Sequence, residues 1–391
     1  MKTPFVLALV LIPAILPAQQ RHPRRWEFSG LPALNFDADE GFGYGALVAI
    51  YNYGEGTQEP YAFTIQPNLF LTTGGRRDVS LFVDAPHLLP NGWRFTANLA
   101  REQQLSTPYY GIGNATAYDS TRERAPNSYY YRFGRVRRQV TLDVQHGILG
   151  LPIRGLIGGG VSTTTFDLTP FDSGTTLVAQ QLAGSNDPLH AWWNYVRGGV
   201  VWDTRDREVA PHRGTWSDVI VQRYDKSLGS ERDYTRWTLT DRRYFPLSDA
   251  ITLADRLLLQ GVEGDVPLTD LSTIQTSFKG QDGLGGANSV RGIPRNRFQG
   301  KGLFVWNTEV RWQAANFHLP IGPAHLILSG FADAGRVWAG RPQLSEVFSD
   351  LHVGYGGGVR LGLGDSFVVA VDVGHSSLST APIYIGLGYL F

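Results

Sequence analysis

Few residues in this chain have the types and spacing that acid–base or nucleophilic chemistry requires. His325 and Ser329 form a candidate pair, because a histidine can take the proton of a serine hydroxyl, as a lipolytic site would require. The segment around them alternates as a β-strand does, and four residues along a strand span about 13 Å. That separation is too long for a hydrogen bond, so we predict two polar residues lining one strand face.

Metal and cofactor chemistry have no better support. The spacing of the remaining histidines that we considered matches no metal site (His87, His190, His212, His318 and His375). No glycine-rich nucleotide loop is present, and the chain has no cysteine. The balance of 35 basic and 35 acidic residues argues against a nucleic-acid surface. The sequence therefore predicts no enzyme, no cofactor, no metal and no nucleic-acid partner.

The two ends of the chain point to an exported membrane barrel. A basic Met1-Lys2, an apolar run and a small-residue site near Ala18 predict a signal peptide at 1–18 and a barrel domain at 19–391. The last nine residues alternate, with one apolar face formed by Ile383, Ile385, Leu387, Tyr389 and Phe391. A barrel in a bilayer has a use for such an end, since its last strand must pair with its first.

The elements between the ends read as strands that are apolar on one face. In 303–312, Phe304, Trp306, Val310 and Trp312 share a face, and Val305, Asn307, Glu309 and Arg311 share the other. In 366–374 the valines at odd positions point out, while Asp372 points in. Together with 46 glycines, many aromatic residues and unequal polar loops, this predicts an all-β transmembrane antiparallel barrel. A soluble β protein would alternate too, with its aromatic face buried, and alternation alone leaves that reading open.

Three ordered segments narrow the class of barrel. The first is Asp203-Thr-Arg205-Asp206 with Gly214 after it, the second is Val290-Arg291-Gly292 in a glycine-rich loop, and the third is Phe331-Ala-Asp333-Ala-Gly335. In this order, and followed by a terminal Phe391, they resemble the BamA/TamA superfamily of outer-membrane assembly and translocation barrels. Each motif alone is weak, but three in order over 203–338 are specific.

The resemblance implies sixteen strands and a sixth outer loop folded into the lumen. It also implies that Arg291 forms a latch with Glu309 and Asp333 on the inner wall, whereas the alternative is an exposed loop arginine beside flexible glycines. The 203–214 segment would support barrel geometry, although its residues are also ordinary turn formers. Gly386, Tyr389 and Phe391 fit the family's C-terminal insertion signal, which the barrel-insertion machinery reads; Ile385 departs from it.

The implied function is insertion or transport of polypeptides in a Gram-negative outer membrane, among its lipids. Family members usually carry periplasmic POTRA domains of about 75–80 residues, and strand-like sequence by Gly41 leaves no room for one here. We therefore expect a periplasmic partner to replace them. The alternative is a passive channel or a structural outer-membrane protein. The client, the partner and the oligomeric state are beyond what this sequence indicates.

Overall fold

A computed structural model describes residues 25–37, 41–55, 58, 60–124, 129–172, 174–208, 210–278, 280–320, 322–363 and 367–391. The predicted signal peptide, 1–18, lies outside these residues. None of the helices among the described residues has the length and apolarity that crossing a membrane would require.

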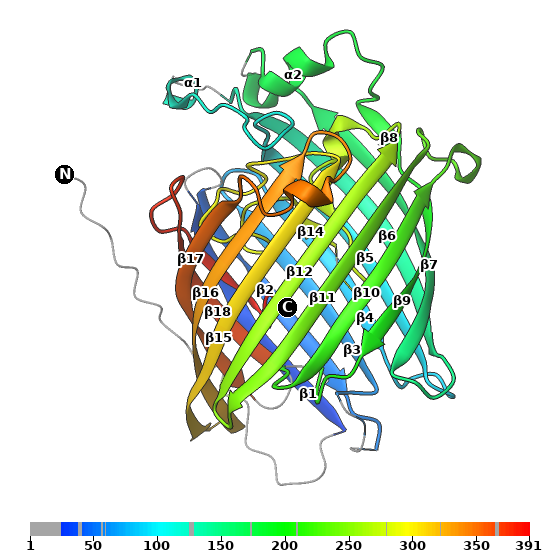
Figure 1. Cartoon of the computed structure of the whole chain (residues 1–391), viewed down its shortest axis with the longest axis vertical. Helices are drawn as coiled ribbons and strands as arrows, with labels where there is room; N and C mark the ends of the chain where they lie inside the picture. The colour runs from blue at the N-terminus through cyan, green and yellow to red at the C-terminus, as the bar shows by residue number, and fades with distance from the viewer. Residues whose placement is uncertain are drawn as a thin grey trace, which may run out of the picture.

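Most of the chain forms one antiparallel sheet, which Figure 1 shows wrapped into a barrel of tilted strands. Its strands are β1 (Trp26–Asp37), β2 (Gly41–Asn52), β3 (Phe63–Thr72), β4 (Arg77–Ala85), β5 (Trp93–Pro108), β6 (Arg132–Gly147), β7 (Ile153–Asp167), β8 (His190–Trp192), β9 (Tyr195–Asp203), β10 (Gly214–Tyr224), β11 (Tyr234–Ser248), β12 (Ile251–Gly264), β15 (Gly302–Leu319), β16 (Gly322–Trp338), β17 (His352–Leu363), β18 (Phe367–His375) and β19 (Ile383–Leu387). The predicted all-β barrel is confirmed.

The strands follow one another around the sheet in chain order. β8 and β9 both pair with β7, at Thr163–Thr165 and at Ile153–Gly160, so they are two halves of one interrupted strand. The 17 strands of the sheet therefore occupy sixteen positions, 17 minus the one that is shared. This is the number that the family resemblance implies.

The connections differ between the two ends of the barrel. At one end, which we call the turn end, they are short, such as 148–152 and 249–250. At the other, the loop end, they include 109–131 and 168–189, with α1 (Ser120–Arg124) and α2 (Leu177–Leu182) (Figure 1). The unequal loops predicted from the sequence are therefore present.

The two faces of the wall have opposite character. On β15, Trp306, Val310 and Trp312 are exposed on the outside, whereas Asn307 and Glu309 are fully buried on the inside. This is the apolar-out, polar-in arrangement predicted for 303–312. A polar interior and an apolar exterior suit a wall whose outer surface faces acyl chains.

Residues 265–301, which we call the lumen loop, fill the interior. The loop carries η3 (Leu268–Asp270), β13 (Thr273–Ile274) and β14 (Gln281–Asp282). Its apolar side chains pack on inward residues of β12, β15 and β16 in one cluster: Leu258, Ile274, Leu284, Val290, Ile293, Phe298, Leu303, Val305 and Val337. Inward apolar residues such as Val305 are thus covered by the loop. Three further short helices are η1 (Pro170–Asp172), η2 (Lys226–Leu228) and η4 (Leu344–Glu346).

The seam between the first and last strands is overlapped. Among the described residues, β1 is in register only with β2 and β19 only with β18. Leu363 and Val369, from the outward series of β17 and β18, pack against Ala49, Tyr51 and Tyr61, of which Ala49 and Tyr51 are on the inward face of β2. The C-terminal edge of the sheet therefore lies inside its N-terminal edge.

The last four residues do not continue β19. Gly388 has a φ of +77°, a left-handed conformation that breaks the strand after Leu387. Phe391 is buried against Tyr244 and Ala254 on the inward faces of β11 and β12. The prediction that Tyr389 and Phe391 share one strand face with Ile383 and Ile385 is therefore wrong, because the kink turns the chain end into the lumen.

Candidate functional site

Arg291 lies at the centre of a buried ion cluster in the lumen. Its Nε donates to Asp333 Oδ2 at 2.8 Å and its Nη2 donates to Asp333 Oδ1 at 3.0 Å, a paired arrangement that favours a fixed orientation. Its backbone N–H also donates to Asp333 Oδ2, at 3.0 Å. Nη1 donates to Glu309 Oε2 at 2.9 Å. The structure thus brings together the three residues that the resemblance assigns to the latch.

Two further charged residues complete the cluster. Arg291 Nη1 also donates to Asp372 Oδ2 at 3.0 Å. Arg360 donates to Asp372 Oδ1 at 2.5 Å and to Glu309 Oε2 at 3.1 Å. The sequence placed Asp372 on the inner face without assigning it a role, and it missed Arg360. Asp372 could have been predicted as a partner of Arg291, because it is a carboxylate on the inward face of the wall.

Phe331 supports the guanidinium from one side. The carbon of the Arg291 guanidinium lies 3.5 Å from the ring centroid, and Phe331 is itself buried. Arg291 and Glu309 are fully buried, and Asp333 is nearly so. Taking such charges out of water is costly, so removing one partner of a buried pair destabilises by about 3–5 kcal/mol. The cluster is therefore a strong constraint on where the lumen loop can sit.

The backbone of the loop motif lies directly on the wall. Gly292 has a φ of +93°, and a Cβ there would sit 2.5 Å from the carbonyl oxygen of His375. Its N–H donates to Tyr384 Oη at 2.9 Å, and its carbonyl accepts from Ser376 Oγ at 2.6 Å. Val290 is fully buried in the lumen cluster, where its side chain lies close to Gly335. Glycine at 292 is thus required both by conformation and by space.

The wall beneath the motif is correspondingly free of side chains. A Cβ on Gly354 would overlap the carbonyl oxygen of Arg291, and one on Gly374 would lie 2.6 Å from the nitrogen of Gly292. These glycines lie on β17 and β18, next to the seam. The latch therefore rests on the strands that form the C-terminal edge of the sheet.

Arg311 connects the latch to the chain end. Its Nε donates to Glu309 Oε1 at 2.9 Å, and its Nη2 donates to the main-chain oxygen of Phe391 at 3.0 Å. Its guanidinium also lies over the ring of Tyr389, 4.2 Å from the centroid. Gly386 pairs with Ala370 on β18. The three residues predicted as an insertion signal thus lie beside the latch, and their role in insertion stays a prediction.

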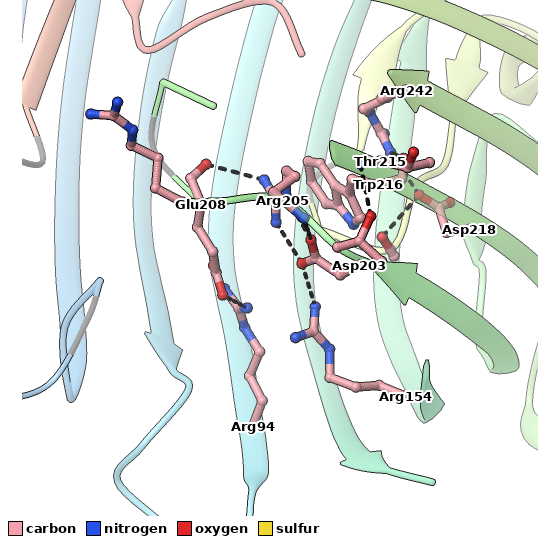
Figure 2. A network of polar contacts seen from close by, with 12 residues as sticks. Arg94, Arg154, Asp203, Arg205, Glu208, Thr215, Trp216, Asp218 and Arg242 are labelled. Atoms are coloured by element: carbon pink, nitrogen blue, oxygen red, sulfur yellow. Dashed lines mark hydrogen bonds and ion pairs between the residues drawn. The ribbon is translucent and has the colours of Figure 1, made fainter. Parts of the chain in front are cut away.

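The Asp203–Gly214 segment forms a second polar network at the turn end, which Figure 2 shows from close by. Asp203 accepts from Arg205 Nε at 2.9 Å and from Arg154 Nη2 at 3.0 Å. The guanidinium carbon of Arg205 lies 4.1 Å from the ring centroid of Trp216, and that of Arg242 lies 4.0 Å from it. These ion pairs and ring contacts therefore hold the turn against the neighbouring strands.

Asp206 and Gly214 fix the course of the same turn. Asp206 Oδ1 accepts from the backbone N–H groups of His212 and Arg213, at 3.0 and 3.3 Å. Gly214 has a φ of +105°, in the region that favours glycine. Both residues thus stabilise the turn, as the turn-forming residue types of this segment indicate.

Glu208 extends this network across the lumen side of the wall. It accepts from Arg94 Nη1 at 2.8 Å and from Arg94 Nη2 at 2.9 Å, and Arg94 also binds Asp84. Burial raises the pKa of the Glu208 carboxyl, but Arg94 and Arg205 lower it more, so the pKa lies below its usual value. The sequence gave no sign of this bridge between the 204–213 turn and β5, because 114 residues separate its two ends.

The lumen loop reaches this network too. Ser277 Oγ donates to Asp218 Oδ2 at 3.1 Å, and the ring of Phe278 meets Trp216 edge-on at 6.4 Å. The loop is thus held on two walls, at Arg291 and at 277–278. At the loop end, Gly113 N–H donates to the carbonyl oxygen of Gln299 at 2.8 Å, so the 109–131 connection contacts the lumen loop as well.

His325 and Ser329 have separate partners. His325 Nδ1 lies 2.7 Å from Asn316 Oδ1 at an exposed site, and Ser329 Oγ accepts from Arg360. Among the residues that the structure describes, no group of three or more His, Asp or Glu side chains is placed to hold a metal ion.

The wall and its buried latch define a class, an outer-membrane-type barrel whose lumen is occupied by its own loop. A family model described as the Omp85 superfamily domain matches residues 70–366. The chain therefore belongs to the Omp85 superfamily, and it is a barrel of the outer-membrane protein assembly and translocation class. None of the curated proteins compared with the chain matches it.

Solved structures show the same fold at low identity. BamA from Haemophilus ducreyi lacking POTRA domains 1–3 is 12% identical, with a TM-score of 0.58, over 93% of this chain and 70% of that one. CdiB from Escherichia coli is 12% identical (TM-score 0.55, 95% and 62% covered), and CdiB from Acinetobacter baumannii is 15% identical (0.52, 94% and 60%). The chain thus spans less than two thirds of either CdiB chain.

Proposed function

We propose that this protein resides in a Gram-negative outer membrane, with its turn end in the periplasm, and helps to insert or transport polypeptides there. The observation that carries the proposal is the seam. Among the described residues, β1 forms no hydrogen-bonded pairing with β19. The C-terminal edge of the sheet lies inside its N-terminal edge. An unpaired strand edge is a template to which another strand can add.

The latch gives this edge a defined position. Arg291 binds Asp333 and Asp372, on β16 and β18, and its loop backbone lies on the glycines of β17. The last three strands before β19 are therefore fixed to the lumen loop, while the N-terminal edge is free of that tie. Opening would then move β1 and β2 relative to a fixed C-terminal edge.

Client capture is proposed to depend on a periplasmic partner acting at the turn end. The protein's own insertion would require the barrel-insertion machinery, to which Gly386, Tyr389 and Phe391 would be presented before the chain end folds inward. We propose no catalytic role for His325 or Ser329, since each is held by a different neighbour.

The test is to lock the seam. The chain has no cysteine, so Ala49→Cys with Val369→Cys places two unique thiols in the overlapped seam. After reaction with a short bismaleimide, we expect the locked barrel to lose its acceleration of the folding of a model outer-membrane barrel into liposomes. Val200→Cys with Val219→Cys, which pair in register between β9 and β10 on the exposed outer face, is the matched control and should stay active. Full activity of the seam-locked barrel would overturn the proposal.

The passive-channel alternative makes a different prediction. It requires steady conductance across a planar bilayer, whereas a lumen held by the loop on two walls should conduct little. Steady conductance with no effect on polypeptide insertion would favour the channel.

A further inference from the structure

The outer wall over β3–β8 carries charge where a lipid-facing surface should not. Two neighbouring register rows of outward residues run across these strands. The first, which we call the arginine row, is Leu69, Val79, Arg101, Arg138, Thr163 and Trp192. The second, the apolar row, is Pro67, Leu81, Leu99, Val140 and Val161.

Arg101 and Arg138 are directly opposite each other on β5 and β6. Arg101 Nη2 donates to Gln103 Oε1 at 2.9 Å, and among the described residues no carboxylate forms an ion pair with either arginine. Like charges facing each other across two strands repel. Arginines on the lipid face of a barrel are destabilising unless something compensates their charge.

The position of Arg101 and Arg138 along the barrel axis indicates what could compensate their positive charge. The next row toward the loop end is largely polar and includes Arg77, Gln103, Thr165 and His190. The apolar row lies on the other side. Trp192, 46% exposed, sits in the arginine row itself, as tryptophans do at membrane interfaces. The arginine row therefore marks the level at which lipid head groups meet acyl chains.

The wall is also hollowed at this place. A groove of about 850 Å³ is lined by both rows and by Ala46 and Val48 of β2. Its floor is almost entirely apolar, and Val79, Leu99 and Val140 in it are exposed. A convex barrel wall offers acyl chains no such recess. The groove thus combines an apolar recess with two cations at its rim that have no carboxylate partner among the described residues.

We propose that this groove binds a phosphorylated, multi-acyl glycolipid of the lipid A type. The phosphates would bind Arg101 and Arg138, and the acyl chains would lie over Leu99, Val140 and Val161. The inference rests on the proposed location, because a loop end facing outward puts the arginine row in the outer leaflet. Arginine forks bind phosphate oxygens in pairs, which is the recognition that this row offers.

The experiment titrates the whole chain in detergent micelles with hexa-acyl lipid A and follows bound lipid by native mass spectrometry. Arg101→Gln with Arg138→Gln should raise the Kd for lipid A about 30-fold, as expected from about 1 kcal/mol for each basic residue at an anionic surface. Arg223→Gln with Arg341→Gln removes two exposed cations that have carboxylate partners, and this control should bind as the wild type does.

A second pair of variants tests the groove without touching charge. Val140→Trp fills the apolar row and should raise the Kd about tenfold, the equivalent of displacing about two methylene groups. Val219→Trp adds the same side chain on β10, outside the groove, and should have no effect. Heat-modifiable mobility on gels shows that each variant is folded.

Wild-type binding by Arg101→Gln/Arg138→Gln, or equal binding of phosphatidylethanolamine and lipid A, would overturn the inference. These outcomes are separate from the seam test. Lipid A binding that persists in a barrel inactive in polypeptide insertion would refute the proposed function alone, and lost lipid selectivity in an active barrel would refute this inference alone.

Discussion

Arg291 and Asp333 are joined by three hydrogen bonds, two from the guanidinium and one from the backbone N–H of Arg291. The carboxylate thus holds both the side chain and the main chain of the lumen loop. Because β16 carries Asp333 and the loop arises between β12 and β15, this single pair ties the loop to a strand beyond its own hairpin.

Replacing Arg291 should loosen the barrel. Arg291→Ala leaves Asp333 and Glu309 buried without their shared cation, and we expect a loss of about 3–5 kcal/mol in the free energy of unfolding. The measurement is the temperature at which the heat-modifiable form disappears on gels in detergent. Arg291→Lys keeps the charge but not the paired geometry, so its unfolding temperature should lie between those of the wild type and Arg291→Ala. An unchanged unfolding temperature in Arg291→Ala would count against the latch.

Asp372 and Arg360 should behave as part of the same cluster. Asp372→Asn removes a carboxylate that both arginines contact, and Arg360→Gln removes a cation that both Asp372 and Glu309 contact. The double variant should be more stable than the sum of the single losses predicts, with a coupling of about 1–3 kcal/mol. Urea unfolding of the four proteins measures this, and strict additivity would show that the two residues act independently.

Alternation in the sequence predicted which residues share one face of a strand, because successive side chains point to opposite faces. Together with the family resemblance, it placed Glu309 inside and Trp306 outside, as the structure has them. Alternation carries no information about a positive φ, so the kink at Gly388 and the inward chain end were missed. Nor does it report contacts between distant segments, such as that between Glu208 and Arg94. Arg360 was missed because the glycines at 354 and 356–358 weaken the strand pattern around it.

The glycines of β17 give a test of how closely the loop lies on the wall. A methyl group at residue 354 would overlap the carbonyl oxygen of Arg291, which is backbone and cannot rotate away. Gly354→Ala should therefore displace the latch and cost about 1–3 kcal/mol. Gly330→Ala on β16 is the matched control, since a Cβ there meets nothing within 4 Å. The difference between the two in unfolding temperature is the readout, and equal stability would show that the loop can withdraw from β17.

The Glu208 bridge should make stability at the turn end depend on acid. The pKa of Glu208 in the folded protein lies below 4.5, its ordinary value, because the effect of Arg94 and Arg205 outweighs that of burial. A carboxylate with a lowered pKa contributes stability that is present in full above the unfolded pKa and is lost as the pH falls through the folded value. Glu208→Gln should therefore be less stable than the wild type by about 1–2 kcal/mol at pH 7, from the lost charged hydrogen bonds.

That difference should stay constant down to about pH 5 and then shrink as the acid range below pH 4.5 is entered, because the wild-type carboxyl becomes protonated there too. Urea midpoints of both proteins between pH 3 and pH 8 measure it. Asp241→Asn, which breaks an ion pair with exposed Arg243 on the outer wall, gives a control for acid effects unrelated to the turn. A gap between wild type and Glu208→Gln that persists unchanged at pH 3 would mean that the contribution of Glu208 does not depend on its charge, and the bridge to Arg94 would then be a packing contact.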